Sequence, residues 1–404
     1  MKLKAWMACL AAVAISAQAQ TPAQAPAKTV KIGVLSDMSG PLADAYGPGS
    51  AHAAELAIED ARKGMPGWNI QFVSGNHQNK VDVASTIARQ WYDVDKVDAI
   101  FDLVNTAVAI AVRGVSRERK KIDWPLTGAS SLTGEHCSPY AVHWSTDTHI
   151  QVNGAVGGVV ATGGKNWFWI TADYSGTREM ANQASGLVEA AGGKVVGQNL
   201  FPMGSTDFAS SVVAAQASNA NVIGLSSGGQ DTINAIKQIA EFGLTAQGKR
   251  IVAPAIFLTD IHALGLKTAQ GVTFVDSTYW DLSDETRAFA KRFQVKMQRP
   301  PTPQQMNTYM AVTHYLKAVK AANTNDADAV MKQVRAIPIN TWNTVNGQVR
   351  ANGSVVRERY VFQVKSPAES KGPWDYLKVA KVLNLTEGAP LPVEKSGCKF
   401  TAKS

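Results

Sequence analysis

Short apolar runs alternate with amphipathic helical segments along most of this chain, and this alternation constrains the fold most strongly. The first unit is the stretch KIGVLSDMSGPLADAYGPGSAHAAELAIEDAR at 31–62. The apolar run at 30–35 is typical of a buried strand, and Gly-Pro-Gly-Ser at 47–50 favours a helix start. Repeated strand-then-helix units predict an α/β fold, in which helices flank parallel central sheets.

The alternation occurs in two similar series, which predict two lobes instead of one large sheet. Candidate strands lie at 30–35, 68–74, 98–104, 122–126 and 141–145 in the first series, and at 167–171, 194–201, 221–225, 251–258 and 271–277 in the second. Consecutive helices then follow from Ser283, and late β-rich pieces come after them. Such a change indicates a chain that crosses back between lobes. We expect crossings near 145–148, 275–278 and 337–346, and hinge closure around a ligand.

The first residues show the three parts of a secretory signal peptide. Two lysines precede an apolar stretch at 5–16, and Ala-Gln-Ala at 17–19 matches a cleavage site. The apolar stretch is too short for a permanent membrane span, so we expect an exported, periplasmic protein. The expected division is a signal peptide at 1–19, a disordered leader at 20–29, lobe 1 at 30–147 plus 277–338, and lobe 2 at 148–276 plus 339–404.

Removal of the signal peptide leaves two cysteines, Cys137 and Cys398. An even number of cysteines in an oxidising compartment predicts one disulfide. This bond would tie the carboxyl-terminal tail to a loop in the first third of the chain. The alternative is a pair of free, buried thiols.

The charge pattern argues against a nucleic-acid partner. The formal net charge of the full chain is +8, and two of these charges belong to lysines of the signal peptide. The densest basic run, RERKK at 117–121, is typical of a solvated helix end. The seven histidines have no spacing that indicates a zinc site, so we expect no metal.

The segment KIGVLSDMSGP at 31–41, with the Gly-rich helix start and Ala-Ile-Glu-Asp that follow, resembles the opening of leucine/isoleucine/valine-type (type I) periplasmic binding proteins. The similarity continues in DTINAIKQ at 231–238 and TYMAVTHYLK at 308–317. The branch it resembles most also handles aromatic and other small carboxylates. The resemblance implies a receptor that closes on a small organic acid or amino acid and delivers it to an ABC permease in the inner membrane. It implies no catalysis and no cofactor, and we expect a monomer.

Polar loops after strands of the first series are candidates for ligand contact. Asn105 and Thr106 precede a helix, whose N-terminus favours a carboxylate. Ser130 and Ser131 lie in a second such loop, and the resemblance implies that these two loops hold the ligand carboxylate. Tyr46, in the first long loop, could cover an apolar ligand. The alternative for the loop residues is helix capping.

The second series and the first crossing supply the remaining candidates. By resemblance, Tyr174 is a cleft aromatic, and Ser226 and Ser227 follow the third strand of their lobe. Asp147 and Asp260 lie near acidic residues that contact an amino group in the family. If both point into the cleft, an α-amino acid fits; if neither does, an unaminated acid fits better. The departures around Asp260 favour an unaminated, aromatic carboxylate.

Two alternative functions stay open at this point. The sequence Gly-Leu-Ser-Ser-Gly at 224–228 matches the nucleophile elbow of serine hydrolases, with Ser226 as nucleophile. Asp260 and either His262 or His314 would complete the order Ser, Asp, His along the chain. The pattern is common in Ser/Gly-rich loops, however, and no HGGG-type segment precedes it. The second alternative is a ligand-sensing module of the same fold.

Overall fold

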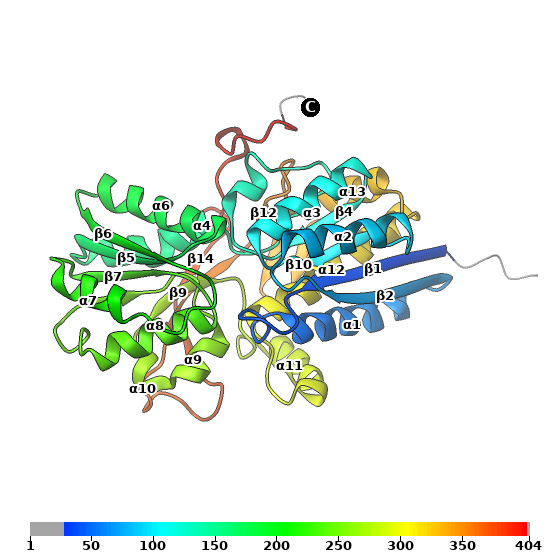
Figure 1. Ribbon diagram of the computed structural model, residues 1–404. Helices are drawn as coiled ribbons and strands as arrows, with labels where there is room; N and C mark the ends of the chain where they lie inside the picture. The colour runs from blue at the N-terminus through cyan, green and yellow to red at the C-terminus, as the bar shows by residue number, and fades with distance from the viewer. Residues whose placement is uncertain (1–27, 402–404) are drawn as a thin grey trace, which may run out of the picture.

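Each lobe is organised around a four-stranded parallel sheet, as the alternating pattern predicts (Figure 1). The computed structural model describes residues 28–401, and the expected signal peptide lies outside them. Lobe 1 has the strand order β2-β1-β3-β4. Its strands are β1 (Lys28–Ser36), β2 (Trp68–Asn76), β3 (Ala99–Asp102) and β4 (Ile122–Pro125). β1 thus begins within the expected leader.

The helices of lobe 1 come from two separate parts of the chain. The crossover helices are α1 (Gly47–Gly64), α2 (Val81–Asp93) and α3 (Thr106–Glu118), with the short η1 (Ser130–Thr133) after β4. The returning chain adds α11 (Asp284–Met297), α12 (Pro303–Ala322) and α13 (Ala327–Ala336). A capping box starts α12, because the Thr302 hydroxyl and the Gln305 side chain accept each other's backbone N–H groups. Tyr315 of α12 then packs against Phe101 of β3.

Lobe 2 repeats this plan with the strand order β6-β5-β7-β8. Its strands are β5 (Asn166–Ala172), β6 (Lys194–Phe201), β7 (Val222–Ser226) and β8 (Arg250–Val252). Its helices are α6 (Ser175–Ala190), α7 (Ala209–Ala217), α8 (Gln230–Glu241), α9 (Leu258–Leu264) and α10 (Leu266–Ala269). All five residues of β7 are buried, as expected for a central strand covered on both faces.

The third crossing lies later in the chain than 337–346, where the sequence pattern puts it. The small sheet of β10 (Ile339–Thr341), β11 (Thr344–Val349) and β12 (Val355–Val356) belongs to lobe 1, because Ile339, Val349 and Val355 pack in the lobe 1 core. The chain enters lobe 2 with β13 (Arg359–Val364), which lies between β9 (Thr273–Asp276) and β14 (Leu377–Leu383). We expected the second part of lobe 2 to begin at residue 339, but it begins just after Val356.

A buried guanidinium joins the three crossings. Arg357, in the third crossing, is 1% exposed. Its Nη2 donates to the carbonyl of Trp144 at 3.0 Å, beside the first crossing, and to Ser277 Oγ at 2.8 Å, in the second. A third bond reaches Asn307 of α12 at 2.5 Å. One side chain thus fixes the spacing of the hinge segments.

The first crossing continues into a helical segment whose hydrogen-bond pattern changes along its length. It consists of α4 (Thr148–Gln151), the π-helical turn η2 (Val152–Val156) and α5 (Gly157–Ala161). At Gly154, a side chain would lie 2.2 Å from the Val275 methyl group of β9. The absence of a side chain therefore lets this turn pack directly on the hinge strand.

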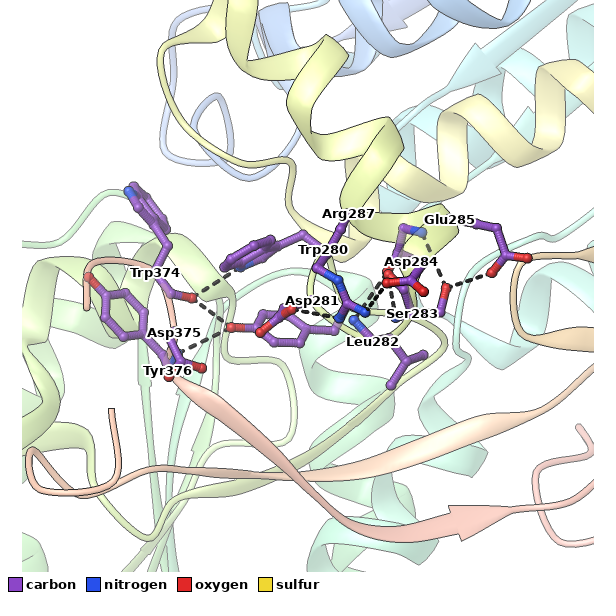
Figure 2. A network of polar contacts seen from close by, with 12 residues as sticks. Trp280, Asp281, Leu282, Ser283, Asp284, Glu285, Arg287, Trp374, Asp375 and Tyr376 are labelled. Atoms are coloured by element: carbon purple, nitrogen blue, oxygen red, sulfur yellow. Dashed lines mark hydrogen bonds and ion pairs between the residues drawn. The ribbon is translucent and has the colours of Figure 1, made fainter. Parts of the chain in front are cut away.

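Hydrogen bonds anchor the second crossing to lobe 2 before the chain enters α11 (Figure 2). The carbonyl of Trp374 accepts bonds from Tyr279 Oη at 2.6 Å and from Trp280 Nε1 at 3.1 Å. Beyond them, Arg287 pairs with Asp281 at 2.9 Å and with Asp284 at 2.6 Å. The crossing therefore has fixed ends on both lobes.

The carboxyl-terminal tail returns to lobe 1, although the expected division gives it to lobe 2. The predicted disulfide between Cys137 and Cys398 is confirmed, with Cα atoms 5.6 Å apart. Arg350 of lobe 1 also donates to the carbonyls of Pro390 and Leu391, ahead of η3 (Val393–Lys395). The tail therefore spans from β14 back across the hinge. Within residues 28–401, no helix is long and apolar enough to cross a membrane.

We expect the double substitution Cys137→Ser and Cys398→Ser to lower the free energy of unfolding by about 4–5 kcal/mol, because the bond closes a very long loop. Urea unfolding of the two proteins measures this difference. Wild-type protein unfolded under reducing conditions should match the double variant. A loss below about 1 kcal/mol would contradict the assignment of a stabilising role.

Candidate functional site

The loops at the carboxyl ends of the strands of both lobes surround one cavity, as the sequence analysis expects. The space open to the centres of water molecules is about 70 Å³. A space of this size suits a small molecule. The lining residues are Leu42, Tyr46, Val104, Thr106, Thr127, Gly128, Ala129 and Gln304 from lobe 1, Ser145, Thr146, Thr148, Gln151 and Asp276 from the hinge, and Tyr174, Gly176, Thr177, Met180, Ser227, Gly228, Ala255 and Phe257 from lobe 2.

Four of the ten predicted contact residues line this cavity: Tyr46, Thr106, Tyr174 and Ser227. Tyr46 meets Phe257 of the opposite lobe edge to face, with ring centroids 5.6 Å apart. The Thr106 hydroxyl lies 2.9 Å from that of Thr127, and the Ser227 hydroxyl 2.7 Å from that of Thr232. The cavity therefore has an aromatic wall and two sets of hydroxyl groups.

Two predicted residues act as helix caps and do not line the cavity. The Asn105 side chain accepts the N–H groups of Ala107 and Val108 at 3.0 and 3.3 Å. The Asp147 side chain accepts the N–H of Ile150 at 2.9 Å and starts α4. Both contacts satisfy N–H groups that a helix leaves free at its first turn.

The two serines after β4 contact the hinge and the opposite lobe instead of the cavity. Ser130 Oγ lies 2.8 Å from Thr148 Oγ1. Ser131 gives its N–H and its hydroxyl to the carboxylate of Glu179 in α6, at 3.1 and 2.7 Å. The lobes are therefore in direct contact at this edge of the cleft.

Ser226 and Asp260 are buried in lobe 2 outside the cavity lining. The Ser226 hydroxyl donates to the carbonyl of Thr177 at 2.7 Å. The Asp260 carboxylate accepts the N–H groups of Phe257 and Gly229 at 3.0 and 3.2 Å, which holds Phe257 over the cleft. Burial raises the pKa of Asp260 to about 7.

Within residues 28–401, neither histidine that the hydrolase alternative names contacts Ser226. His262 bonds Tyr376 Oη at 2.8 Å and stacks on Trp374. His314 lies in lobe 1 and bonds the carbonyl of Val334 at 3.0 Å. The Ser226 hydroxyl faces a backbone carbonyl, so neither histidine is placed to accept its proton.

The sequence pattern located the second crossing, but it did not indicate that Asp276, within this crossing, lines the cavity. Asp276 ends β9, and its two carboxylate oxygens accept bonds from the Ser277 N–H at 2.7 Å and from Gln304 Nε2 at 2.9 Å. Burial raises the pKa of Asp276, while the Ser277 N–H and the nearby Arg357 and Arg359 oppose this effect. Among the described residues that line the cavity, Asp276 is the one carboxylate, and none is Lys, Arg or His.

Three further lining residues carry buried polar atoms that have no hydrogen-bond partner within residues 28–401. They are Thr146 Oγ1, Gln151 Oε1 and Gln304 Oε1. Buried polar atoms in native proteins are nearly always paired, so a ligand or a water molecule in the cavity is the natural partner for these three. Two of them are amide oxygens, as the hydrogen-bond pattern assigns them, and these accept hydrogen bonds.

Three helices begin at the cavity. Thr106 is the first residue of α3, Gly176 lies in the first turn of α6, and Gly228 immediately precedes the N-cap of α8. Helix N-termini carry partial positive charge and free N–H groups. The parts of the cavity surface next to these helix starts therefore suit a carboxylate, although no cationic side chain among the described lining residues faces the cavity.

A strained turn brings the loop before α3 to the cavity. Asp102 and Leu103 adopt left-handed φ angles of 82° and 47°, which are unfavourable for residues other than glycine. Asp102 is fully buried, and its carboxylate accepts a bond from Ser50 of α1 at 3.3 Å. Thr308 of α12 in turn donates to Ser50 at 3.2 Å. Burial raises the pKa of Asp102 to about 7.

Comparison with known proteins identifies relatives along nearly the whole chain. Residues 29–373 match the family described as periplasmic binding protein. A periplasmic binding protein from Burkholderia mallei is 38% identical, with a TM-score of 0.87 over 93% of this chain and 99% of that chain. A branched chain amino acid ABC transporter periplasmic ligand-binding protein from Burkholderia xenovorans is 36% identical, with a TM-score of 0.81 over 92% and 99%.

A solute binding protein of an ABC transporter from R. palustris, in complex with benzoate, shares the fold at 19% identity. Its TM-score is 0.75 over 92% of this chain and 99% of that chain. No curated protein matches the chain.

We expect Asp102→Asn to remove part of the pH dependence of stability. The pKa of Asp102 is about 7 when folded and near 4 when unfolded, so folding retains a proton that unfolding releases. The free energy of unfolding of the wild type therefore falls as pH rises from about 4 to about 7. The free energy of unfolding of the variant, relative to that of the wild type, should therefore increase by up to about 4 kcal/mol between pH 4 and pH 7.

Urea unfolding of both proteins at intervals between pH 4 and pH 8 measures this difference. Asp82→Asn serves as the control, because Asp82 lies in the first turn of α2 and is exposed. A difference between Asp102→Asn and wild type that stays constant or shrinks with rising pH would contradict the raised pKa.

Proposed function

The chain belongs to the family of periplasmic binding proteins, and we propose that the solute it carries is a small zwitterionic α-amino acid. It is a solute-binding protein of an ABC transporter. We further propose that the protein is a monomer in the periplasm and that it delivers the solute to a permease in the inner membrane. It includes no catalytic step and no cofactor.

The charge of the cavity carries the proposal. Asp276 offers one negative group at the hinge, and the N-termini of α3, α6 and α8 favour a carboxylate elsewhere on the cavity surface. A zwitterion satisfies both. A bare carboxylate within about 4 Å of an ionised Asp276 would instead be disfavoured by roughly 4 kcal/mol at an effective dielectric constant of 20. The unpaired Gln151 and Gln304 oxygens add acceptors for an ammonium group.

An unaminated aromatic acid is the second candidate, and two observations favour it. Neither Asp147 nor Asp260 lines the cavity, and the wall contains Tyr46 and Phe257. Because burial raises the pKa of Asp276, a protonated Asp276 could donate to such an acid. We rank this candidate below the amino acid because the 36%-identical relative is described as a branched chain amino acid transporter component, whereas the benzoate-bound structure shares only the fold.

We expect branched-chain L-amino acids, but not benzoate or 4-hydroxybenzoate, to raise the melting temperature. Ligand at 100 times its Kd should add about 2.7 kcal/mol of stability. Asp276→Asn should weaken L-leucine binding about 10- to 100-fold, because it removes a charge-assisted bond to the ammonium group. Titration calorimetry measures both Kd values.

Asp281→Asn is the matched control for this substitution. Asp281 lies five residues further along the same crossing but outside the cavity lining, where it pairs with Arg287. L-Leucine affinity should be unchanged in this variant. Stabilisation by benzoate alone, or equal L-leucine affinity in Asp276→Asn and wild type, would exclude the amino-acid assignment.

We expect Ser226→Ala to retain ligand-induced stabilisation, since the Ser226 hydroxyl bonds a backbone carbonyl outside the cavity lining. The cost is the loss of one buried hydrogen bond, about 1 kcal/mol of folding stability. Hydrolysis of p-nitrophenyl acetate should be at background for both proteins. Hydrolysis by the wild type that is lost in the variant would revive the serine hydrolase alternative.

A further inference from the structure

Glu179 reaches across the cleft from lobe 2 and is held by donors of lobe 1 and the hinge. Its Oε1 accepts the Ser131 N–H at 3.1 Å and the Thr148 hydroxyl at 3.1 Å. Its Oε2 accepts the Ser131 hydroxyl at 2.7 Å. Gln183, one turn further along α6, donates to Oε1 at 3.1 Å and orients the carboxylate.

These contacts depend on closure of the lobes. Glu179 belongs to α6 of lobe 2, whereas Ser131 belongs to η1 of lobe 1, and the two elements are joined only through the hinge. When the lobes separate, water must replace the Ser131 donors at the Glu179 carboxylate. Hydrogen bonds to an ionised acceptor are stronger than neutral ones, so this cluster favours the closed state.

Glu179 itself does not line the cavity, although its neighbour Met180 and its partner Thr148 do. We propose that Glu179 is a positioning residue, a latch that sets the lifetime of the closed, loaded protein without touching the ligand. The proposal rests on the proposed function, because it assumes that closure traps a solute. It also gives Ser131 a role other than the ligand contact that the sequence analysis expects.

The latch makes a specific kinetic prediction. Ligand enters the open protein, in which Glu179 and Ser131 are apart, and leaves only after the latch breaks. Glu179→Gln removes the negative charge and replaces one of the two acceptor oxygens by an NH₂ group, so the bonds from Ser131 and Thr148 weaken. We therefore expect the dissociation rate to rise about 10- to 100-fold, and the association rate to change less than about threefold.

Stopped-flow tryptophan fluorescence with L-leucine measures both rates. Glu189→Gln is the matched control, because it makes the same change of charge at an exposed site near the end of α6. Ser131→Ala removes one of the two Ser131 donors and should raise the dissociation rate less than Glu179→Gln. The double variant should dissociate no faster than Glu179→Gln alone, since both changes break one cluster.

A second readout separates the latch from the identity of the ligand. Hydrogen exchange of the segment 128–134, measured without ligand, should be faster in Glu179→Gln than in Glu189→Gln, because the ligand-free protein closes less often when the Ser131 N–H meets a neutral amide instead of a carboxylate. Failure of L-leucine to bind the wild type would overturn the amino-acid assignment alone. Equal exchange in the two variants, or an unchanged dissociation rate in Glu179→Gln, would overturn the latch.

Discussion

The two-lobed arrangement depends on the hydrogen bonds that the buried Arg357 guanidinium donates. It joins the carbonyl of Trp144, the hydroxyl of Ser277 and the amide of Asn307, so all three crossings meet at one cation. Its position also bears on function, because Asp276 lies next to Ser277 at the cavity. A charge removed from water is costly, and the loss of any of these three bonds would raise that cost, which disfavours separation of the segments at this point. The hinge therefore bends around a fixed polar centre.

Strand direction explains why the polar loops converge. In a parallel sheet all crossover helices begin at the carboxyl edge, so each lobe presents several helix N-termini on one side. The hinge turns these sides toward each other, and α3 of lobe 1 then begins opposite α6 and α8 of lobe 2. The site is thus a consequence of topology, whereas its selectivity depends on the few side chains that the hinge adds.

The alternating pattern was sufficient to predict both parallel sheets, and the even number of cysteines in the exported chain was sufficient to predict the disulfide. It could not separate a cap from a ligand contact. Asn105 and Thr106 are adjacent, yet one satisfies the helix and the other lines the cavity. Asp276 escaped detection because β9 pairs antiparallel with β13, at Tyr360, more than eighty residues away. The third crossing was misplaced because β10–β12 are short strands that could belong to either lobe until packed.

Asp276 is the carboxylate that lines the cleft, and its charge limits which charged groups a ligand can carry. In the closed protein, Glu179 occupies the donors of Ser131 and Thr148, so a bound solute cannot use them. A ligand carboxylate is left with the helix N-termini of α3, α6 and α8, and a carboxylate near Asp276 would be repelled. A single negative group on a small solute is therefore what the closed cleft can satisfy.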